Sequence, residues 1–244
     1  MPEAVLVAVA HGSADPRASA TITALVAVAR ERLPGLDLRT AFLGHAPPSL
    51  PQVLSAVEAD REVTVLPLLL TAAYHSKADI PRMLARSPRP QVSYGATLGP
   101  HPLLLRALER RLAEADPSAH ENPARTAVVL AAAGSSDPEA NAIIARLAAQ
   151  WQARTGWFAV QPAYASAAEP SPAAAVADLL RARAPRVAVA TYLLAPGLFA
   201  DRIRQSTLAA GAAAVSPALG ACAEVADVLL DRFAQTGSRR RTAA

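Results

Sequence analysis

The two halves of this sequence resemble each other, and this repetition constrains the fold more than any other feature. When the chain is displaced by 122 residues, HGSADP at 11–16 falls on AGSSDP at 133–138, and AFLGHAPPSL at 41–50 falls on AYASAAEPSP at 163–172. Within two residues of the same displacement, PLLL meets TYLL and LGPHP meets LGACA, in the same order along the chain. Matches that keep one order and nearly one spacing predict a tandem duplication.

The duplication predicts a domain organisation. We expect a first lobe at 1–115, a polar linker at 116–126 and a second lobe at 127–235. The last residues, 236–244, read TGSRRRTAA and are expected to form a disordered basic tail.

Each half alternates segments typical of strands and of helices. The apolar run AVLVAVA at 4–10 has the length of a strand buried on both faces of a parallel sheet. Asp15 and Pro16 then supply a helix start, and apolar residues follow at helical spacing. The other expected strands are 36–43, 62–70 and 91–97 in the first half, and 126–133, 157–165, 186–194 and 212–219 in the second. This alternation predicts the α/β class, with two similar doubly wound parallel-sheet lobes and an active-site cleft between them.

The composition excludes several classes of function. The first 122 residues hold as many acidic as basic residues, and three of the surplus arginines lie in the tail. The body therefore lacks the basic footprint that nucleic-acid binding needs. A single cysteine, Cys222, excludes an internal disulfide. No apolar run has the length of a membrane helix or the flanks of a signal segment, so we expect a soluble, cytoplasmic protein without a membrane partner.

Four of the five histidines follow predicted strands of the first half. His11, His45, His75 and His101 each lie just past one of these strands, whereas His120 lies in the linker. In open α/β sheets, ligands bind outside the carboxyl ends of the strands. The four histidines are therefore expected at the edge of the sheet where a ligand would bind.

The second half lacks these imidazoles. The matching positions hold Ala133, Ala167, Phe199 and Cys222, although the Gly, Ser, Asp and Pro of the turns are kept. A histidine that served only packing or capping would be needed in both copies, because both copies build the same fold. The comparison thus separates scaffold residues from residues that carry chemistry.

On this basis His11 and His75 are assigned to a functional site. His45 stays open between a structural and a functional role, and His101, which lies between two prolines, either opens a helix or joins the site. Tyr74 and Lys77 flank His75 closely and lie either at the rim of the site or on a solvated face.

The sequence also limits the chemistry of these histidines. It contains no G-x-S-x-G elbow, no G-x-G-x-x-G segment and no phosphate-binding P-loop. Neutral imidazole binds Fe, Co, Ni, Cu and Zn, and it accepts protons near neutral pH. Two or three imidazole ligands leave a metal incompletely coordinated, which suits a site that must pass the metal on.

These motifs carry a family resemblance. AHGSADPRA, FLGHAPPSL, PLLLTAAYHSKADIP and LGPHPLL together resemble the sirohydrochlorin chelatases, which are class II tetrapyrrole chelatases of the CbiX and SirB kind. The match is strong over residues 5–112 and weaker over 127–235, as in the long two-lobed members whose other lobe carries no metal ligands.

The resemblance implies insertion of a divalent metal, Fe2+ or Co2+, into sirohydrochlorin or a related anionic tetrapyrrole without ATP. His11 and His75 would hold the metal and take up the protons that leave the pyrrole nitrogens. The metal is a substrate, so no permanently bound cofactor is expected. Many relatives have an acidic residue at Gly44 and a basic one at Ala14, so the adjacent His45 is the candidate third ligand and one carboxylate contact is missing.

Hydrogen-bond donors and cations of the protein would bind the carboxylates of such a substrate. Ser13, Tyr74 and Lys77 are the candidates in the first half, and Arg202 and Arg204 are the candidates in the second. For the two arginines, the alternative is that they are solvated helix charges.

Two other classes of function stay open. A non-catalytic carrier would hold a metal or tetrapyrrole with the same histidines, and a plain α/β interaction module would bind no transition metal. Two lobes could form the cleft within one chain, so a monomer would suffice.

Overall fold

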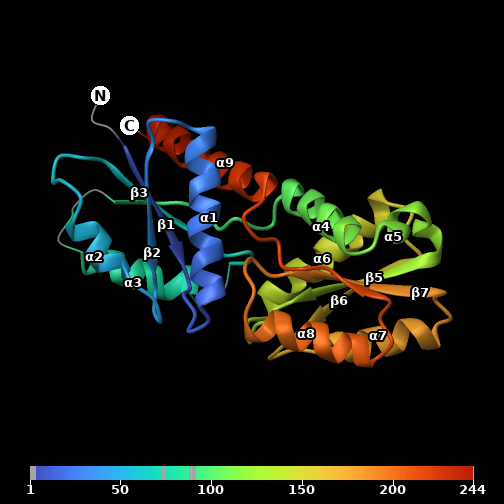
Figure 1. The fold of residues 1–244 in the computed structure, drawn as a ribbon. Helices are drawn as coiled ribbons and strands as arrows, with labels where there is room; N and C mark the ends of the chain where they lie inside the picture. Colours follow the sequence, from blue (N-terminus) through green and yellow to red (C-terminus); the bar gives the residue numbers. More distant parts are fainter. Residues whose placement is uncertain (1–3, 73–74, 88, 90–91, 244) are drawn as a thin grey trace. The chain divides into compact units, whose positions relative to one another are not determined.

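The computed structural model describes residues 4–72, 75–87, 89 and 92–243. The chain divides into two compact units, each an α/β lobe (Figure 1). The first unit comprises Met1–Leu103 together with Gly220–Ala244, and the second comprises Leu104–Leu219. The two predicted α/β lobes are therefore confirmed.

The first unit contains a four-stranded parallel sheet in the order β2-β1-β3-β4. Its strands are β1 (Val5–Ala10), β2 (Asp37–Phe42), β3 (Val63–Pro67) and β4 (Val92–Tyr94). All six residues of β1 are buried, as expected for a central strand that is covered on both faces.

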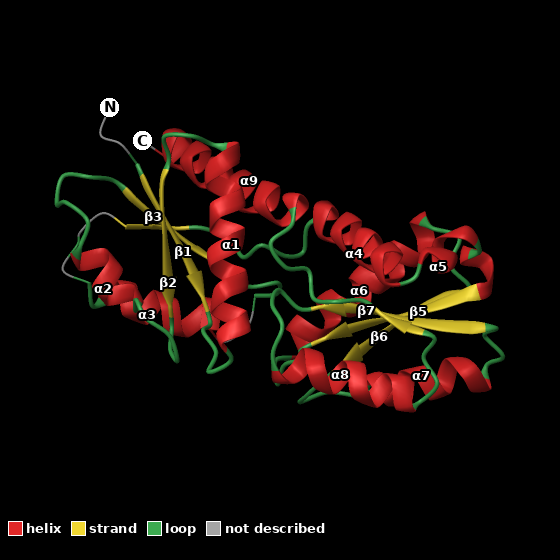
Figure 2. Cartoon of the chain, in the orientation of Figure 1, coloured by secondary structure: helices red, strands yellow, loops and turns green. Residues whose placement is uncertain are grey.

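The described part of this unit contains five helical segments. They are α1 (Pro16–Arg32), α2 (Leu50–Ser55), η1 (His75–Asp79), α3 (Ile80–Ala85) and α9 (Ala223–Ala243). Apolar residues of α2 and α3 pack on one face of the sheet, and α1 and α9 lie together against the other (Figure 2). The sheet is thus doubly wound, as predicted.

The second unit repeats this sheet as β6-β5-β7-β8, again wholly parallel. Its strands are β5 (Thr126–Ala132), β6 (Ala159–Tyr164), β7 (Arg186–Tyr192) and β8 (Ala214–Val215). Its helices are α4 (Pro102–Ala115), α5 (Pro117–Glu121), η2 (Pro123–Arg125), α6 (Pro138–Arg154), α7 (Pro172–Arg181) and α8 (Leu198–Ala209). Helices α7 and α8 contribute Val176 and Ile203 to the core on one face of this sheet.

The two copies build the turn after their first strand in the same way. Asp15 accepts a hydrogen bond from the Arg17 backbone N–H and caps α1, and Asp137 accepts one from Glu139 and caps α6. Since capping carboxylates satisfy otherwise unpaired N–H groups, both copies keep the Asp-Pro pair for helix initiation.

The predicted lobe boundaries are wrong in one respect, because the helices that follow β4 and β8 are exchanged between the units. Helix α4 buries its apolar stripe in the second unit, where Glu109 accepts a hydrogen bond from Trp151 Nε1 at 2.9 Å. Helix α9 packs on α1 and β3 of the first unit, and Arg232 donates hydrogen bonds to the Leu98 and Pro100 carbonyls. An amphipathic pattern predicts that one face of a helix is buried, but it does not predict which sheet that face packs against.

The segment at 116–126 is not a simple linker. It contains α5 and η2 and ends at the first residue of β5. Asp116 is buried, and its carboxylate accepts hydrogen bonds from Ser118 Oγ and from the Arg186 guanidinium of β7. These contacts make the segment part of the second unit.

The tail predicted as disordered is helical instead, since α9 continues to Ala243. The hydroxyl of Thr236 donates to the Arg232 carbonyl at 2.9 Å, and that of Ser238 donates to Ala234 at 3.1 Å. In both bonds a short polar side chain reaches back to the carbonyl one turn earlier, so the hydroxyl is satisfied within the helix.

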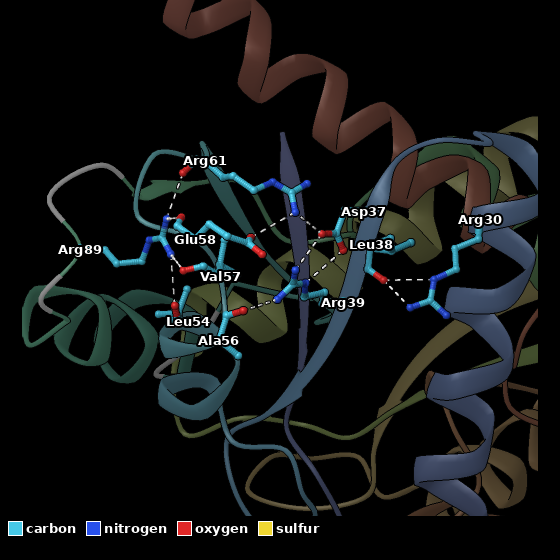
Figure 3. A network of polar contacts seen from close by, with 10 residues as sticks. All are labelled: Arg30, Asp37, Leu38, Arg39, Leu54, Ala56, Val57, Glu58, Arg61 and Arg89. Atoms are coloured by element: carbon cyan, nitrogen blue, oxygen red, sulfur yellow. Dashed lines mark hydrogen bonds and ion pairs between the residues drawn. The ribbon is translucent and has the colours of Figure 1, made fainter. Parts of the chain in front are cut away.

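Arg39, Arg61 and Arg89 form a network of polar contacts at the amino end of the first sheet (Figure 3). Asp37, the first residue of β2, accepts hydrogen bonds from Arg39 and Arg61. The Arg39 guanidinium also donates to the Ala56 carbonyl, and Arg89 donates to the carbonyls of Leu54, Val57, Glu58 and Arg61. Guanidinium groups thus bind carbonyls at and beyond the end of α2, at the edge of the sheet opposite to the histidines.

No helix among the described residues is both apolar enough and long enough to span a bilayer.

Candidate active site

The carboxyl edge of the first sheet carries the segments that hold His11, His45 and His75. His11 follows β1 directly, His45 follows β2, and His75 begins η1 beyond β3. Because β1 lies between β2 and β3 in the sheet, the His11 loop lies between the other two segments. The expected placement of these three positions at one sheet edge is therefore observed for the backbone.

The loops that carry His11 and His45 are in direct backbone contact. The Gly44 N–H donates to the His11 carbonyl at 3.2 Å. Gly12 has a φ of +86°, and a Cβ placed on it would lie 1.7 Å from the Gly44 carbonyl oxygen. Only glycine allows both this conformation and this close approach. The side chain of His11 is exposed at this junction.

His45 adopts a left-handed backbone conformation with a φ of 63°. The matching residue of the second unit, Ala167, has a φ of 59° without an imidazole. The scaffold therefore sets this conformation in both copies, and it fixes the direction in which the exposed His45 side chain leaves the chain.

His75 opens a π-helical turn, His75–Asp79, that leads into α3. Such turns are rare and are found frequently at functional sites. In the second unit the segment after β7 starts α8 as a regular helix at Leu198, so the π turn is specific to the copy with the histidines. The side chain of His75 and the whole of Tyr74 lie outside the described residues.

The ligand set itself stays a prediction. Among the side chains that the structure describes, no three His, Cys, Asp or Glu residues come together in a group able to hold a metal ion. The set His11, His45 and His75 falls outside this comparison because it includes the imidazole of His75.

His101 has a structural role. Its Nδ1 accepts a hydrogen bond from the Leu103 N–H at 3.3 Å at the start of α4, and its Nε2 lies 3.7 Å from an Asp231 carboxylate oxygen. Burial lowers the pKa of His101, and the positive charge of Arg232 lowers it further, against the opposing effect of Asp231. Of the two roles left open by the sequence, the helix-opening role is the one for which the structure gives contacts.

The candidate substrate contacts of the first unit differ in their surroundings. Ser13 Oγ accepts a hydrogen bond from the Asp15 N–H at 3.1 Å, and Ser135 accepts one from Asp137 at 3.0 Å in the other copy. This shared geometry gives Ser13 a role in the turn. Lys77 is exposed on η1, two residues after His75.

The candidate arginines of the second unit lie on α8, and both are exposed. Arg204 donates to the Val215 carbonyl at 3.4 Å and lines a cavity of about 510 Å3 between α8 and β8, which Asp201 also lines. Arg202 is not among the residues that line this cavity.

One residue near the candidate site was not identified from the sequence. Tyr94, at the end of β4, donates a hydrogen bond through its hydroxyl to the Ser76 carbonyl of η1 at 2.9 Å. Burial raises the pKa of Tyr94 to about 12. The strand pattern gave no signal for this contact, because periodicity does not report which loop a strand residue reaches.

Comparison with solved structures shows which known fold this chain shares. The fold is similar to that of SirB from Bacillus subtilis with Fe3+, with a TM-score of 0.81 at 23% identity over 98% of both chains. It is also similar to the sirohydrochlorin chelatase SirB from Bacillus subtilis subspecies spizizenii in complex with cobalt, with a TM-score of 0.79 at 22% identity over 98% of this chain and 97% of that one. The chain thus has the two-lobed chelatase fold.

The chain belongs to the CbiX family. The CbiX family model matches residues 5–115 and matches again at residues 127–236, which covers both copies of the duplication. A sirohydrochlorin cobaltochelatase of Priestia megaterium is 27% identical over 203 residues, which span 81% of this chain and 66% of that protein. A sirohydrochlorin ferrochelatase of the same organism is 27% identical over 203 residues, which span 81% of this chain and 75% of that protein.

Proposed function

We propose that this chain is a sirohydrochlorin chelatase, a lyase that inserts a divalent metal into the tetrapyrrole without ATP. The reaction exchanges one Fe2+ or Co2+ ion for the two protons of the pyrrole nitrogens, so charge is conserved. The relatives support this class of reaction, since they include proteins named for cobalt and for iron. The product would be sirohaem or the cobalt complex that leads towards cobalamin.

The observation that carries the proposal is the distribution of histidines over two copies of one scaffold. His11 and His45 lie on loops whose hydrogen bonds and φ angles recur in the second unit, where alanine takes their places. The scaffold therefore does not require the imidazoles. Their confinement to one sheet edge supports a role in chemistry.

His11 and His75 are the proposed metal ligands and proton acceptors. A neutral imidazole nitrogen uses the same lone pair to bind a metal or to accept a proton. As the metal leaves an imidazole for the macrocycle, that nitrogen becomes free to accept a pyrrole proton. One pair of histidines can thus serve in both steps, and no separate base is needed.

His45 is the proposed third ligand. The family resemblance implies an acidic ligand at the position of Gly44, and glycine has no side chain that could bind a metal. A Cβ at Gly44 would meet no atom within 4 Å, so the loop has room for a side chain that this sequence does not use. The exposed imidazole of His45, one residue further on, is a chemically suitable replacement.

The proposed substrate contacts are the hydroxyls of Ser13 and Tyr74 and the cations of Lys77, Arg202 and Arg204. Carboxylates of the tetrapyrrole would be bound by these donors and charges. The exposure of Lys77 and of both arginines leaves their charges accessible to a ligand.

The test is anaerobic absorbance of the purified protein with sirohydrochlorin and Fe2+ or Co2+. We expect multiple turnovers for the wild type and a loss of at least about a hundredfold in kcat for His11→Ala and for His75→Ala. His120→Ala is the matched control, because it removes the same side chain from α5 of the second unit. This control is expected to keep wild-type turnover.

The carrier function makes a different prediction in the same experiment. A carrier would shift the spectrum of the bound tetrapyrrole, but metal would enter no faster than in the uncatalysed reaction. That outcome would replace the chelatase proposal by the carrier.

A further inference from the structure

The π turn that begins at His75 is tied to the sheet by a side chain from the edge strand. Tyr94 is the last residue of β4, and its hydroxyl donates to the Ser76 carbonyl at 2.9 Å. Ser76 is buried, with 7% of its surface exposed. The hydrogen bond therefore joins a buried part of the turn to the sheet, one residue after His75.

The local sequence explains why an external donor is useful at this carbonyl. A π-helix is continued by an N–H five residues after each carbonyl. The residue five positions after Ser76 is Pro81, which has no N–H. The Tyr94 hydroxyl supplies a donor to the Ser76 carbonyl from outside the turn.

The second unit shows that the fold does not need this tyrosine. Val65 pairs with Tyr94 in the first sheet, and Val189 pairs with Val215 in the second, so Val215 is the structural counterpart of Tyr94. Valine has no hydroxyl. Tyrosine and π turn occur together in the copy that has the histidines, and neither occurs in the matching part of the other copy.

We propose that Tyr94 is a positioning residue for the reaction: its hydroxyl holds the Ser76 carbonyl, and thereby the turn that presents His75 at the carboxyl edge of the sheet. This inference rests on the proposed function, because it assigns His75 a part in metal transfer. Tyr94 acts through a turn that carries His75 and also Lys77, so its removal should affect the chemical step more than tetrapyrrole binding.

The test is Tyr94→Phe, which removes the hydroxyl and keeps the ring. A catalytic group that is displaced by about 1 Å loses on the order of a hundredfold in rate, so we expect a fall in kcat of about tenfold to a hundredfold, with a smaller change in KM for the tetrapyrrole. In the His75→Ala background the same substitution should cause no further fall in kcat.

Tyr164→Phe is the matched control. Tyr164 of β6 also donates a hydrogen bond to a backbone carbonyl, that of Asn141, at 2.9 Å, and burial raises its pKa too. Removing this hydroxyl takes away an equivalent hydrogen bond in the unit without the histidines. We expect it to lower the thermal unfolding temperature to a similar degree and to leave kcat unchanged.

The outcomes separate this inference from the proposed function. The positioning role is overturned if the wild type turns over and Tyr94→Phe keeps the wild-type kcat. It is also overturned if Tyr94→Phe lowers kcat in the His75→Ala background by as much as it does in the wild type. If the wild type does not turn over, the chelatase proposal fails, and the role of Tyr94 is read from Co2+ binding by equilibrium titration. A Kd that rises at least tenfold in Tyr94→Phe, but not in Tyr164→Phe, would then support the positioning role, and a smaller change would overturn it.

Discussion

Replacement of Gly12 by alanine tests how strongly activity depends on the placement of the loops that carry His11 and His45. Gly12 has a φ of +86°, and an added Cβ would lie 1.7 Å from the Gly44 oxygen, whereas real Cβ atoms essentially never approach closer than 3.0 Å. The His11 and His45 loops must therefore separate by at least about 1.3 Å. The left-handed conformation and the displaced loop together should cost about 2–4 kcal/mol of unfolding free energy.

The duplication supplies a control with almost the same geometry. Gly134 has a φ of +83°, and its added Cβ would lie 1.9 Å from the Ser166 oxygen. Gly134→Ala should cost about as much stability as Gly12→Ala, because the same two effects apply. Only Gly12→Ala displaces loops with histidines, so only it should lower kcat by about a hundredfold.

The assay combines urea unfolding with chelation turnover measured well below the unfolding transition. Equal losses of turnover in the two variants would show that activity follows stability alone, and the argument from loop placement would be refuted. Unchanged stability in both variants would refute the steric argument itself.

Two further predictions concern Gly44 and His101. Since a Cβ at Gly44 would meet no atom within 4 Å, Gly44→Glu should fold normally. It should also restore turnover to a His45→Ala variant, as measured by metal insertion against each single variant. His101 has a pKa below its usual 6.5 in the fold, chiefly through burial, so the unfolded state binds more protons as the pH falls below that value. The unfolding free energy should therefore decrease from about pH 6.5 downwards and level off below the folded-state pKa, and His101→Asn should remove this part of the dependence in urea titrations at several pH values.

The alternation of strands and helices was predictable because it depends on local pattern. The run at 4–10 is apolar throughout, and Val5–Ala10 is the buried central strand. The exchange of α4 and α9 was not predictable, since it depends on which sheet covers an amphipathic helix. The helical course of 236–243 was likewise missed, because composition does not show that a preceding helix can extend through polar residues.

The candidate site was predictable as an edge but not as a set of ligands. The rule for parallel sheets places His11, His45 and His75 together because their strands end together. The rule carries no distances, however, so it does not tell which imidazoles come within reach of one metal ion. The contact between Tyr94 and Ser76 was invisible for the same reason, since it depends on the path of the chain after β3.

The duplication allows scaffold and chemistry to be separated within a single molecule. Where both copies share a conformation and a residue type, as at Ser13 and Ser135, the residue is explained by the turn that it builds. Where they share the conformation but not the side chain, as at His45 and Ala167, the fold does not account for the imidazole. By this criterion Ser13 is the weakest of the proposed substrate contacts, and His45 gains support as a ligand. Ser13→Ala should therefore lower stability more than turnover, and His45→Ala should lower turnover more than stability.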